Sequence, residues 1–190
     1  MPHSEQLSTA DSALLVIDVQ EKLMPLIHEG ESIIRNIGFL IDGARLLNLP
    51  VLATEQYPKG LGHTVEPIRE KRDEIPEKVA FSCAAVKEVV ETLHHEARPK
   101  VVLVGIESHV CVQQTALDLL ALNFRVYIPV DSVSSRFVVD HETALRRLEK
   151  TGVILTTAES VLFECVGSKD HEAFKGVSSL VQERMKQMKE

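Results

Sequence analysis

Short apolar runs alternate with longer amphipathic stretches along the chain, and this alternation constrains the fold more than any other feature. The runs are 13–18, 51–54, 101–105, 125–130 and 153–156, and a further short extended piece is expected at 78–81. Most runs are continuously apolar, which is typical of strands covered on both faces. The stretches between them have helical spacing. Strands that alternate with helices predict an α/β fold, a three-layer sandwich whose parallel sheet has helices on both faces.

The length of the chain predicts one domain. Its 190 residues are enough for a well-buried core, since domains most often have about 100–150 residues. The sequence contains no internal repeat, no low-complexity segment and no linker rich in Pro, Gly or Ser. We therefore expect residues 1–190 to form a single domain. We expect its ends, residues 1–10 and 186–190, to be poorly ordered.

The charge balance argues against two classes of partner. The chain carries 21 basic and 28 acidic side chains, a net charge of −7, and its basic residues are dispersed. Proteins that bind nucleic acid need a basic excess to neutralise phosphates, so we expect no nucleic-acid partner. No segment approaches the roughly 20 uninterrupted apolar residues of a membrane span, so we expect no membrane partner.

The cysteines and the N-terminus predict a cytoplasmic protein. The sequence starts without a basic region followed by an apolar stretch, so we expect no secretory signal. The three cysteines, Cys83, Cys111 and Cys165, are an odd number, widely spaced and without a C-x-x-C pair. They resemble neither a disulfide framework nor a zinc site. Reduced thiols in the cytoplasm are the expectation.

Candidate functional residues follow the predicted strands, because parallel sheets bind ligands beyond the carboxyl ends of their strands. Asp18 ends the first run, and a buried acid is costly there unless it caps a helix or takes part in chemistry. The loop after the second run contains Tyr57, and it either shapes a pocket or is an ordinary surface loop. Lys78 precedes an apolar segment that could hold it inward, and a solvated surface charge is the alternative.

Cys111 is the candidate nucleophile. The third apolar run ends at Gly105, and a helical pattern begins at Cys111. Free N–H groups and the positive end of the dipole at a helix N-terminus favour thiolate over thiol. The alternative is that Cys111 is a small hydrophobic residue buried at the junction of a strand and a helix.

Neither a cofactor nor a metal is predicted. No G-x-G-x-x-G follows the first run and no G-x-x-x-x-G-K-[ST] occurs, so the usual cradles for nucleotide phosphates are missing. This argues against a flavodoxin-like nucleotide-binding domain. The 8 histidines show no spacing typical of metal ligands.

Four stretches of the sequence together resemble one superfamily. In order and spacing they are similar to isochorismatase-like cysteine hydrolases, which include nicotinamidases and N-carbamoyl amidohydrolases. Within that superfamily the stretches resemble the isochorismatase domain-containing proteins most closely. They are 14–22, 54–62, 105–112 and 130–136, and the resemblance extends from about residue 14 to about residue 167.

The resemblance implies a six-stranded parallel sheet and a catalytic triad of Asp18, Lys78 and Cys111. It also implies a cis peptide bond between Ile106 and Glu107. The backbone N–H groups of Glu107 and Cys111 would then form an oxyanion hole. A homo-oligomer is implied as well.

Several further side chains are candidates for lining a pocket for a small-molecule substrate. They are Gln20, Tyr57, Phe81, His109 and Ser135. Plain packing or surface exposure is the alternative for each of them.

One departure from the superfamily pattern narrows the function. Nicotinamidases hold a metal with an Asp-x-His pair and a further His after the second strand, and the loop 55–63 lacks this arrangement. Superfamily members without a nucleophilic thiol cleave vinyl ethers, so Cys111 favours acyl transfer instead. We therefore hypothesise metal-independent hydrolysis of a small amide or related C–N bond through a thioester. The alternative is a catalytically silent binding or regulatory module on the same scaffold.

Overall fold

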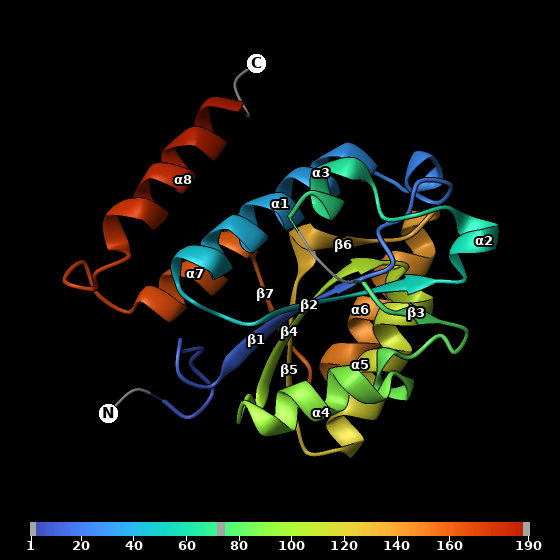
Figure 1. Cartoon of the computed structure of the whole chain (residues 1–190), viewed down its shortest axis with the longest axis horizontal. Helices are drawn as coiled ribbons and strands as arrows, with labels where there is room; N and C mark the ends of the chain where they lie inside the picture. Colours follow the sequence, from blue (N-terminus) through green and yellow to red (C-terminus); the bar gives the residue numbers. More distant parts are fainter. Residues whose placement is uncertain (1–2, 72–74, 188–190) are drawn as a thin grey trace.

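A single parallel sheet forms the centre of the molecule in the computed structural model, which describes residues 3–71 and 75–187 (Figure 1). Its order is β3-β2-β1-β4-β5-β7, and a further short strand, β6, pairs with β4. The strands are β1 (Ser12–Ile17), β2 (Val51–Gln56), β3 (Glu77–Lys78), β4 (Lys100–Ile106), β5 (Arg125–Pro129), β6 (Val133–Ser134) and β7 (Ile154–Thr156).

Strands are present at the five predicted apolar runs, β3 occupies 77–78 where an extended piece was expected at 78–81, and β6 makes a seventh strand. The extra strand arises because β5 pairs only with the first part of β4, residues 100–102. The last part of β4, Gly105 and Ile106, pairs with Val133 and Ser134 of β6 instead. A strand of two residues has no periodicity of its own, so the sequence pattern did not predict it.

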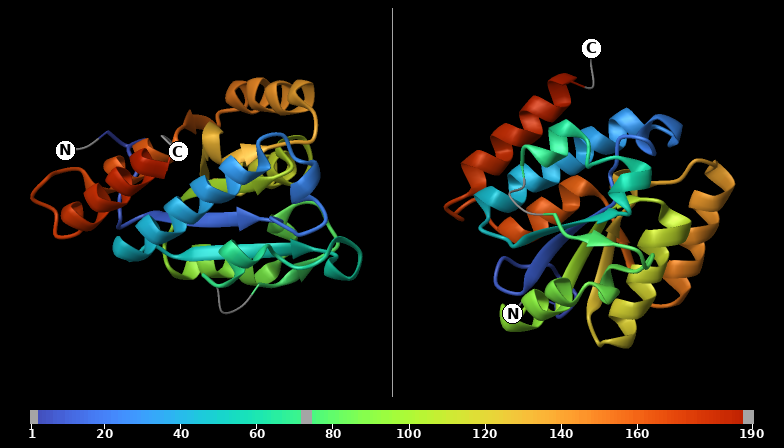
Figure 2. Two further views of the ribbon diagram at one scale, coloured as in Figure 1. Left: turned by 90° about the horizontal axis from the view of Figure 1, so that it is seen from above. Right: turned by 45° about the vertical axis from the view of Figure 1, so that its right-hand side comes forward.

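Helices cover both faces of the sheet, as predicted (Figure 2). One face carries α1 (Gly30–Leu46), α3 (Glu66–Arg69), α7 (Ala158–Val166) and α8 (Phe174–Gln187). The other carries α4 (Lys87–His95), α5 (Gln113–Ala121) and α6 (Val138–Lys150). A single turn, α2 (Pro58–Leu61), lies in the loop after β2.

The two central strands explain the continuous apolar runs. Every residue of β1 and of β4 is buried. Side chains alternate across a strand, so Leu14 and Val16 join the core under α1 while Leu15 and Ile17 join the core under α5. Both faces of these two strands therefore require apolar side chains, so apolar and polar residues do not alternate along them.

Part of the N-terminal segment contacts the domain, and the expectation that residues 1–10 are poorly ordered stays a prediction. Leu7 is buried in the core, and its N–H donates to Glu164. Lys100 donates to the carbonyl of Gln6. Of residues 186–190, the first two lie in α8, and residues 1–2 and 188–190 lie outside the described residues. In the part of the chain that is described, no helix has the length and apolar character of a membrane span.

The order in which the chain adds strands to the sheet reverses between the two central strands, β1 and β4. From β1 the chain proceeds outward to β2 and β3, and from β4 it proceeds outward in the opposite direction. Gly105 permits a close approach there: its φ is +115°, and a Cβ on it would lie 2.1 Å from the carbonyl oxygen of Ile17. Ligands of open parallel sheets bind at such a switch point. Asp18 follows β1 at this point, and residues 107–112 follow β4.

Candidate active site

Asp18 lies at the switch point with a fully buried side chain. Its φ is +53°, in the left-handed region that non-glycine residues rarely adopt. Backbone strain of this kind gathers at functional sites. The Asp18 N–H donates to the carbonyl of Thr54, and the Thr54 hydroxyl donates to Asp18 Oδ1 at 2.9 Å. The end of β2 thereby fixes the carboxylate.

Lys78 is the ionic partner of Asp18. Its Nζ donates to Asp18 Oδ2 at 2.7 Å, and the two side chains are 2% and 1% exposed. Nζ also lies 2.8 Å from Gln56 Oε1, 3.2 Å from the carbonyl oxygen of Ala80 and 2.9 Å from that of Phe81. A buried ammonium needs such oxygen partners. The surface-charge alternative for Lys78 is therefore wrong.

Cys111 completes the group at the carboxyl edge. It lies in a π-helical turn, residues 108–112, directly before α5. The charges of Asp18 and Lys78 both act on its thiol, and Cys111 as a whole residue is 7% exposed. Asp18 and Lys78 are in direct contact and Cys111 lies within reach of both charges, and a catalytic triad of the three stays a prediction.

The expectation of a stabilised thiolate on Cys111 is not met. Burial, and next the negative charge of Asp18, raise the pKa of Cys111, and the opposing charge of Lys78 does not outweigh them. Burial also raises the pKa of Asp18, against the charge and the hydrogen bond of Lys78. The helix begins at Gln113, after the cysteine, so the dipole acts less directly than we expected. Both groups favour their protonated forms.

Glu107 joins the end of β4 to the cysteine turn. The Ile106–Glu107 peptide bond is cis. The Glu107 carbonyl accepts from the N–H groups of Val110 and Val112, at 3.1 and 3.2 Å. Its carboxylate pairs with Arg136, which follows β6.

The candidate substrate-binding side chains differ in their surroundings. Gln20 is buried, and its amide holds the loop after β2: Nε2 donates to the carbonyls of Gln56 and Gly62, and Oε1 accepts from the Gln56 N–H. Tyr57 and Phe81 are 54% and 51% exposed. Gln20 thus supports the loop that carries Tyr57, and contact of these three with a substrate stays a prediction.

His109 and Ser135 contact each other. His109 Nδ1 lies 2.9 Å from Ser135 Oγ, and its Nε2 lies 3.8 Å from Asp140 Oδ2. His109 belongs to the cysteine turn and Ser135 follows β6, so both lie at the carboxyl edge. A role of either in substrate binding is likewise still a prediction.

Two residues near Asp18 escaped the sequence analysis. The Thr54 hydroxyl lies between Asp18 Oδ1 and Cys83 Sγ, 3.3 Å from the sulfur. Because the hydroxyl proton goes to the carboxylate, Cys83 is the donor of the second bond. Burial, followed by the charge of Asp18, raises the pKa of Cys83 to about 11, in agreement with a protonated thiol. The position of Thr54 at the end of a predicted strand could have indicated a role at the site. Nothing in the sequence around Cys83 indicates one.

Two side chains of types that can bind metals, Glu55 at the end of β2 and His63 in the loop after it, lie side by side. Glu55 accepts from the Thr64 N–H at 2.6 Å, and its other oxygen lies 3.1 Å from His63 Nδ1. Burial alone would raise the pKa of Glu55, but these partners lower it overall. Among residues 3–71 and 75–187, no three His, Cys, Asp or Glu side chains gather in a way that could hold a metal ion.

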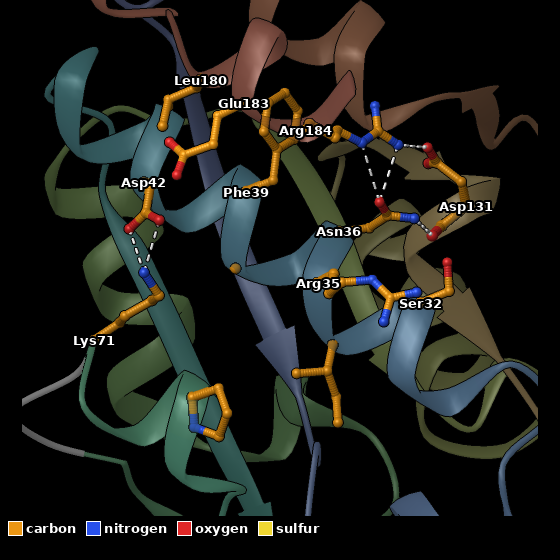
Figure 3. Close-up of a pocket in the computed structure, with 13 residues that line it drawn as sticks. Ser32, Arg35, Asn36, Phe39, Asp42, Lys71, Asp131, Leu180, Glu183 and Arg184 are labelled. Atoms are coloured by element: carbon orange, nitrogen blue, oxygen red, sulfur yellow. Dashed lines mark hydrogen bonds and ion pairs between the residues drawn. The ribbon is translucent and has the colours of Figure 1, made fainter. Parts of the chain in front are cut away.

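A cavity of about 640 Å³ lies apart from this site, between α1, α3 and α8 (Figure 3). Its polar side chains bind one another. Arg184 contacts Asn36 and Asp131 at 3.0 Å and lies over the ring of Phe39, 4.9 Å from its centroid. These contacts fasten α8 to the domain. Asp131 also accepts from the N–H of Ala158, the first residue of α7, so it caps α7.

A family model and several known proteins that are similar to this chain point to the same family. Residues 12–160 match the family model of the isochorismatase domain. Isochorismatase domain-containing protein 1 of Salmo salar is 41% identical over 177 residues, 92% of this chain; the chain spans 62% of that relative's length. Isochorismatase domain-containing protein 2 of Danio rerio is 40% identical over 177 residues, 93% of this chain and 89% of the relative.

Solved structures show the same fold. The MAR1 ribonuclease of Caenorhabditis elegans has a TM-score of 0.89 and 43% identity, with coverage of 93% of this chain and 92% of that one. The YcaC gene product of Escherichia coli, described as an octameric hydrolase of unknown specificity, has a TM-score of 0.86 and 22% identity, with coverage of 95% and 91%. By its parallel sheet and by the match over residues 12–160, this chain belongs to the isochorismatase domain family.

Proposed function

We propose that the protein is a cysteine hydrolase that cleaves a small amide or related C–N bond through a thioester, without a metal. The observation that carries this proposal is the buried ion pair of Asp18 and Lys78 at the switch point of the sheet, whose two charges both act on the thiol of Cys111. A nucleophile beside a base that a third group holds in place is the usual arrangement for covalent catalysis.

In the proposed first step, Asp18 takes the proton of Cys111 while the sulfur attacks the substrate carbonyl. The N–H groups of Glu107 and Cys111 receive the developing oxyanion, and one such donor is worth about 2.7–4 kcal/mol. The C–N bond then breaks, and the amine leaves with the proton that Asp18 held. Water attacks the thioester in the second step; Asp18 accepts its proton, and Cys111 recovers a proton as the acid leaves.

The directions in which the pKa values of Asp18 and Cys111 shift are consistent with these reaction steps. A base with an ordinary carboxyl pKa is weak at neutral pH, and burial raises the pKa of Asp18 toward the working range. The thiol also has a raised pKa, so it keeps its proton at rest. The proposed first step starts from the ionised form of Asp18, which the ammonium of Lys78 favours against the effect of burial. Lys78 stabilises the anion in either arrangement of the proton, because its ammonium contacts the site throughout.

The experiment is a panel of small amides, carbamoyl compounds and nicotinamide, assayed with and without a chelator. Cys111→Ala should abolish turnover, and Cys165→Ser, a buried cysteine outside the site, serves as the matched control. Circular dichroism confirms that both variants fold. Undiminished turnover in Cys111→Ala excludes a nucleophilic role, and loss of turnover on chelation excludes the metal-independent reaction.

A catalytically silent binding module is the alternative on the same scaffold, favoured by the small exposure of Cys111. The panel separates the two: binding of a substrate-like amide without turnover, and without any covalent adduct of Cys111 by mass spectrometry, supports the module.

A ribonuclease is the second candidate, favoured by the 43% identity to the MAR1 ribonuclease structure. The net charge of −7 opposes it, because the chain has no basic excess to balance a run of phosphates. A labelled single-stranded RNA tests this candidate. Cleavage that persists in Cys111→Ala would replace the amide proposal with a thiol-independent ribonuclease.

Self-association and a cytoplasmic location stay predictions. Apolar side chains at the start of α6 are exposed, namely Phe137, Val138 and Val139, which supports a surface between copies. Size-exclusion chromatography with light scattering measures the number of subunits.

A further inference from the structure

Three consecutive residues at the start of the cysteine turn are tied to one other segment. Each of them makes a side-chain hydrogen bond to residues 135–141, which we name the positioning segment. The ties are Glu107 Oε1 with Arg136 N and Nε at 3.1 and 3.0 Å, Ser108 Oγ with His141 Nδ1 at 2.9 Å, and His109 Nδ1 with Ser135 Oγ at 2.9 Å.

We propose that the positioning segment fixes the cysteine turn relative to Asp18, and that the bond between Ser108 and His141 is its central tie. His141 is thereby a positioning residue, because it acts on Cys111 through Ser108. The proposal rests on the proposed function only for what the turn does chemically. The contacts themselves hold for any role of the thiol.

The turn needs a tie from outside because its backbone is unusual. Residues 108–112 form a π-helical turn, in which the Val112 N–H reaches back to the carbonyl of Glu107. Such turns are rare and concentrate at functional sites. Ser108 is completely buried, so its hydroxyl depends on a protein partner, and His141 supplies it from the first turn of α6.

The chemistry of His141 suits an acceptor. Burial, and then the charge of His28, lower the pKa of His141, so the neutral imidazole is favoured. A neutral ring carries one nitrogen that accepts and one that donates. Ser108 can therefore donate to Nδ1 while Nε2 keeps its proton.

The consequence for Cys111 is positional. The sulfur and Ser108 belong to the same turn of five residues, so a turn released from His141 moves the sulfur relative to the carboxylate of Asp18. Misplacement by about 1 Å can cost roughly 100-fold in rate. The loss should fall mainly on kcat, because neither Ser108 nor His141 is among the candidate substrate-binding side chains.

The test combines a double-mutant cycle with a rescue. His141→Leu and Ser108→Ala each remove the bond, and His141→Asn retains a polar atom near the position of Nδ1. The exposed His95 on α4 supplies the matched control, His95→Leu. The primary measurement is the rate at which iodoacetamide alkylates Cys111 as a function of pH, followed by mass spectrometry. It requires no substrate.

We expect the alkylation profile of His141→Leu and of Ser108→Ala to shift toward that of an ordinary thiol, with a midpoint of about 8.5. The double variant should shift no further than either single variant. His141→Asn should restore most of the wild-type profile, and His95→Leu should match the wild type. With a substrate in hand, kcat should fall about 10–100-fold in His141→Leu while KM changes little.

Three results would overturn the inference: an unchanged profile in His141→Leu, an equal change in His141→Asn, or additive effects in the double variant. If no amide is cleaved but the profile shifts as expected, the proposed function fails and the positioning role stands.

Discussion

The ion pair between Asp18 and Lys78 yields a stability prediction that does not depend on any substrate. Lys78→Met keeps a side chain of similar length and removes the ammonium. The carboxylate of Asp18 then stays buried without its cation, since the two side chains are 1% and 2% exposed. Removing one partner of a buried pair typically costs about 3–5 kcal/mol.

The loss should depend on pH. Burial raises the pKa of Asp18 in the folded protein, and Lys78 is the largest opposing influence, so its removal raises that pKa further. A group with a folded pKa above its unfolded value binds more protons when folded. Stability therefore falls as the pH rises from the unfolded toward the folded pKa, by at most about 1.36 kcal/mol per pH unit. The variant should be least affected at low pH, where Asp18 is protonated.

Urea denaturation at pH 6, 7 and 8 measures this effect in the wild type, in Lys78→Met and in Asp18→Asn/Lys78→Met. For a domain of this size, a loss of 3–5 kcal/mol lowers the Tm by about 6–20 °C. The double variant should regain part of the lost stability. Its stability should no longer depend on pH in the way that Lys78→Met does, because the asparagine that replaces Asp18 does not titrate. Lys87→Met, at an exposed i,i+4 pair, is the control. A loss below about 1 kcal/mol, or one independent of pH, would refute the reasoning.

Three further predictions concern other parts of the molecule. Thr54→Val leaves Asp18 Oδ1 without its hydroxyl donor and should cost about 1–3 kcal/mol in urea denaturation; Thr54→Ser should retain most of that stability, and equal losses would contradict the assignment. Burial raises the pKa of Cys83 to about 11 and that of Cys165 to about 12, so neither should react with iodoacetamide at pH 8 until urea is added. Arg184→Met removes the contacts that fasten α8, so hydrogen exchange of the amides in α8 should accelerate; unchanged exchange would show that apolar contacts alone hold this helix.

Sequence pattern predicted the sheet well for a physical reason. The strands β1 and β4 are buried on both faces, which forces a continuous apolar run that is visible in a single sequence. The same rule located Asp18 at the carboxyl end of β1. Helix starts are less evident from the sequence: α6 begins at Val138, although helical spacing of apolar residues is clear only over residues 141–148. The exposed Phe137 and Val139 disturb the helical periodicity there.

The partners of the site residues could not be predicted from the sequence. Thr54 meets Asp18 because β2 lies beside β1 in the sheet. Cys83 reaches Thr54 from a separate turn, in which the Cys83 N–H donates to Thr115. Spacing along the chain carries no sign of which hydroxyl faces which carboxylate. The pKa of Cys111 escaped prediction for the same reason, since it depends on the depth of burial and on the Asp18 charge rather than on the nearby helix.

We expect this site to assemble late in folding, because it joins segments that are far apart in the sequence. Ile17 at the end of β1 lies beside Gly105 of β4, and the groups around the thiol come from positions as distant as 18 and 141. Contacts of such long range form only when most of the chain has collapsed around them. Fragments that end before α6 should therefore lack the assembled centre. Turnover would then report the fraction of intact, fully folded molecules in a preparation.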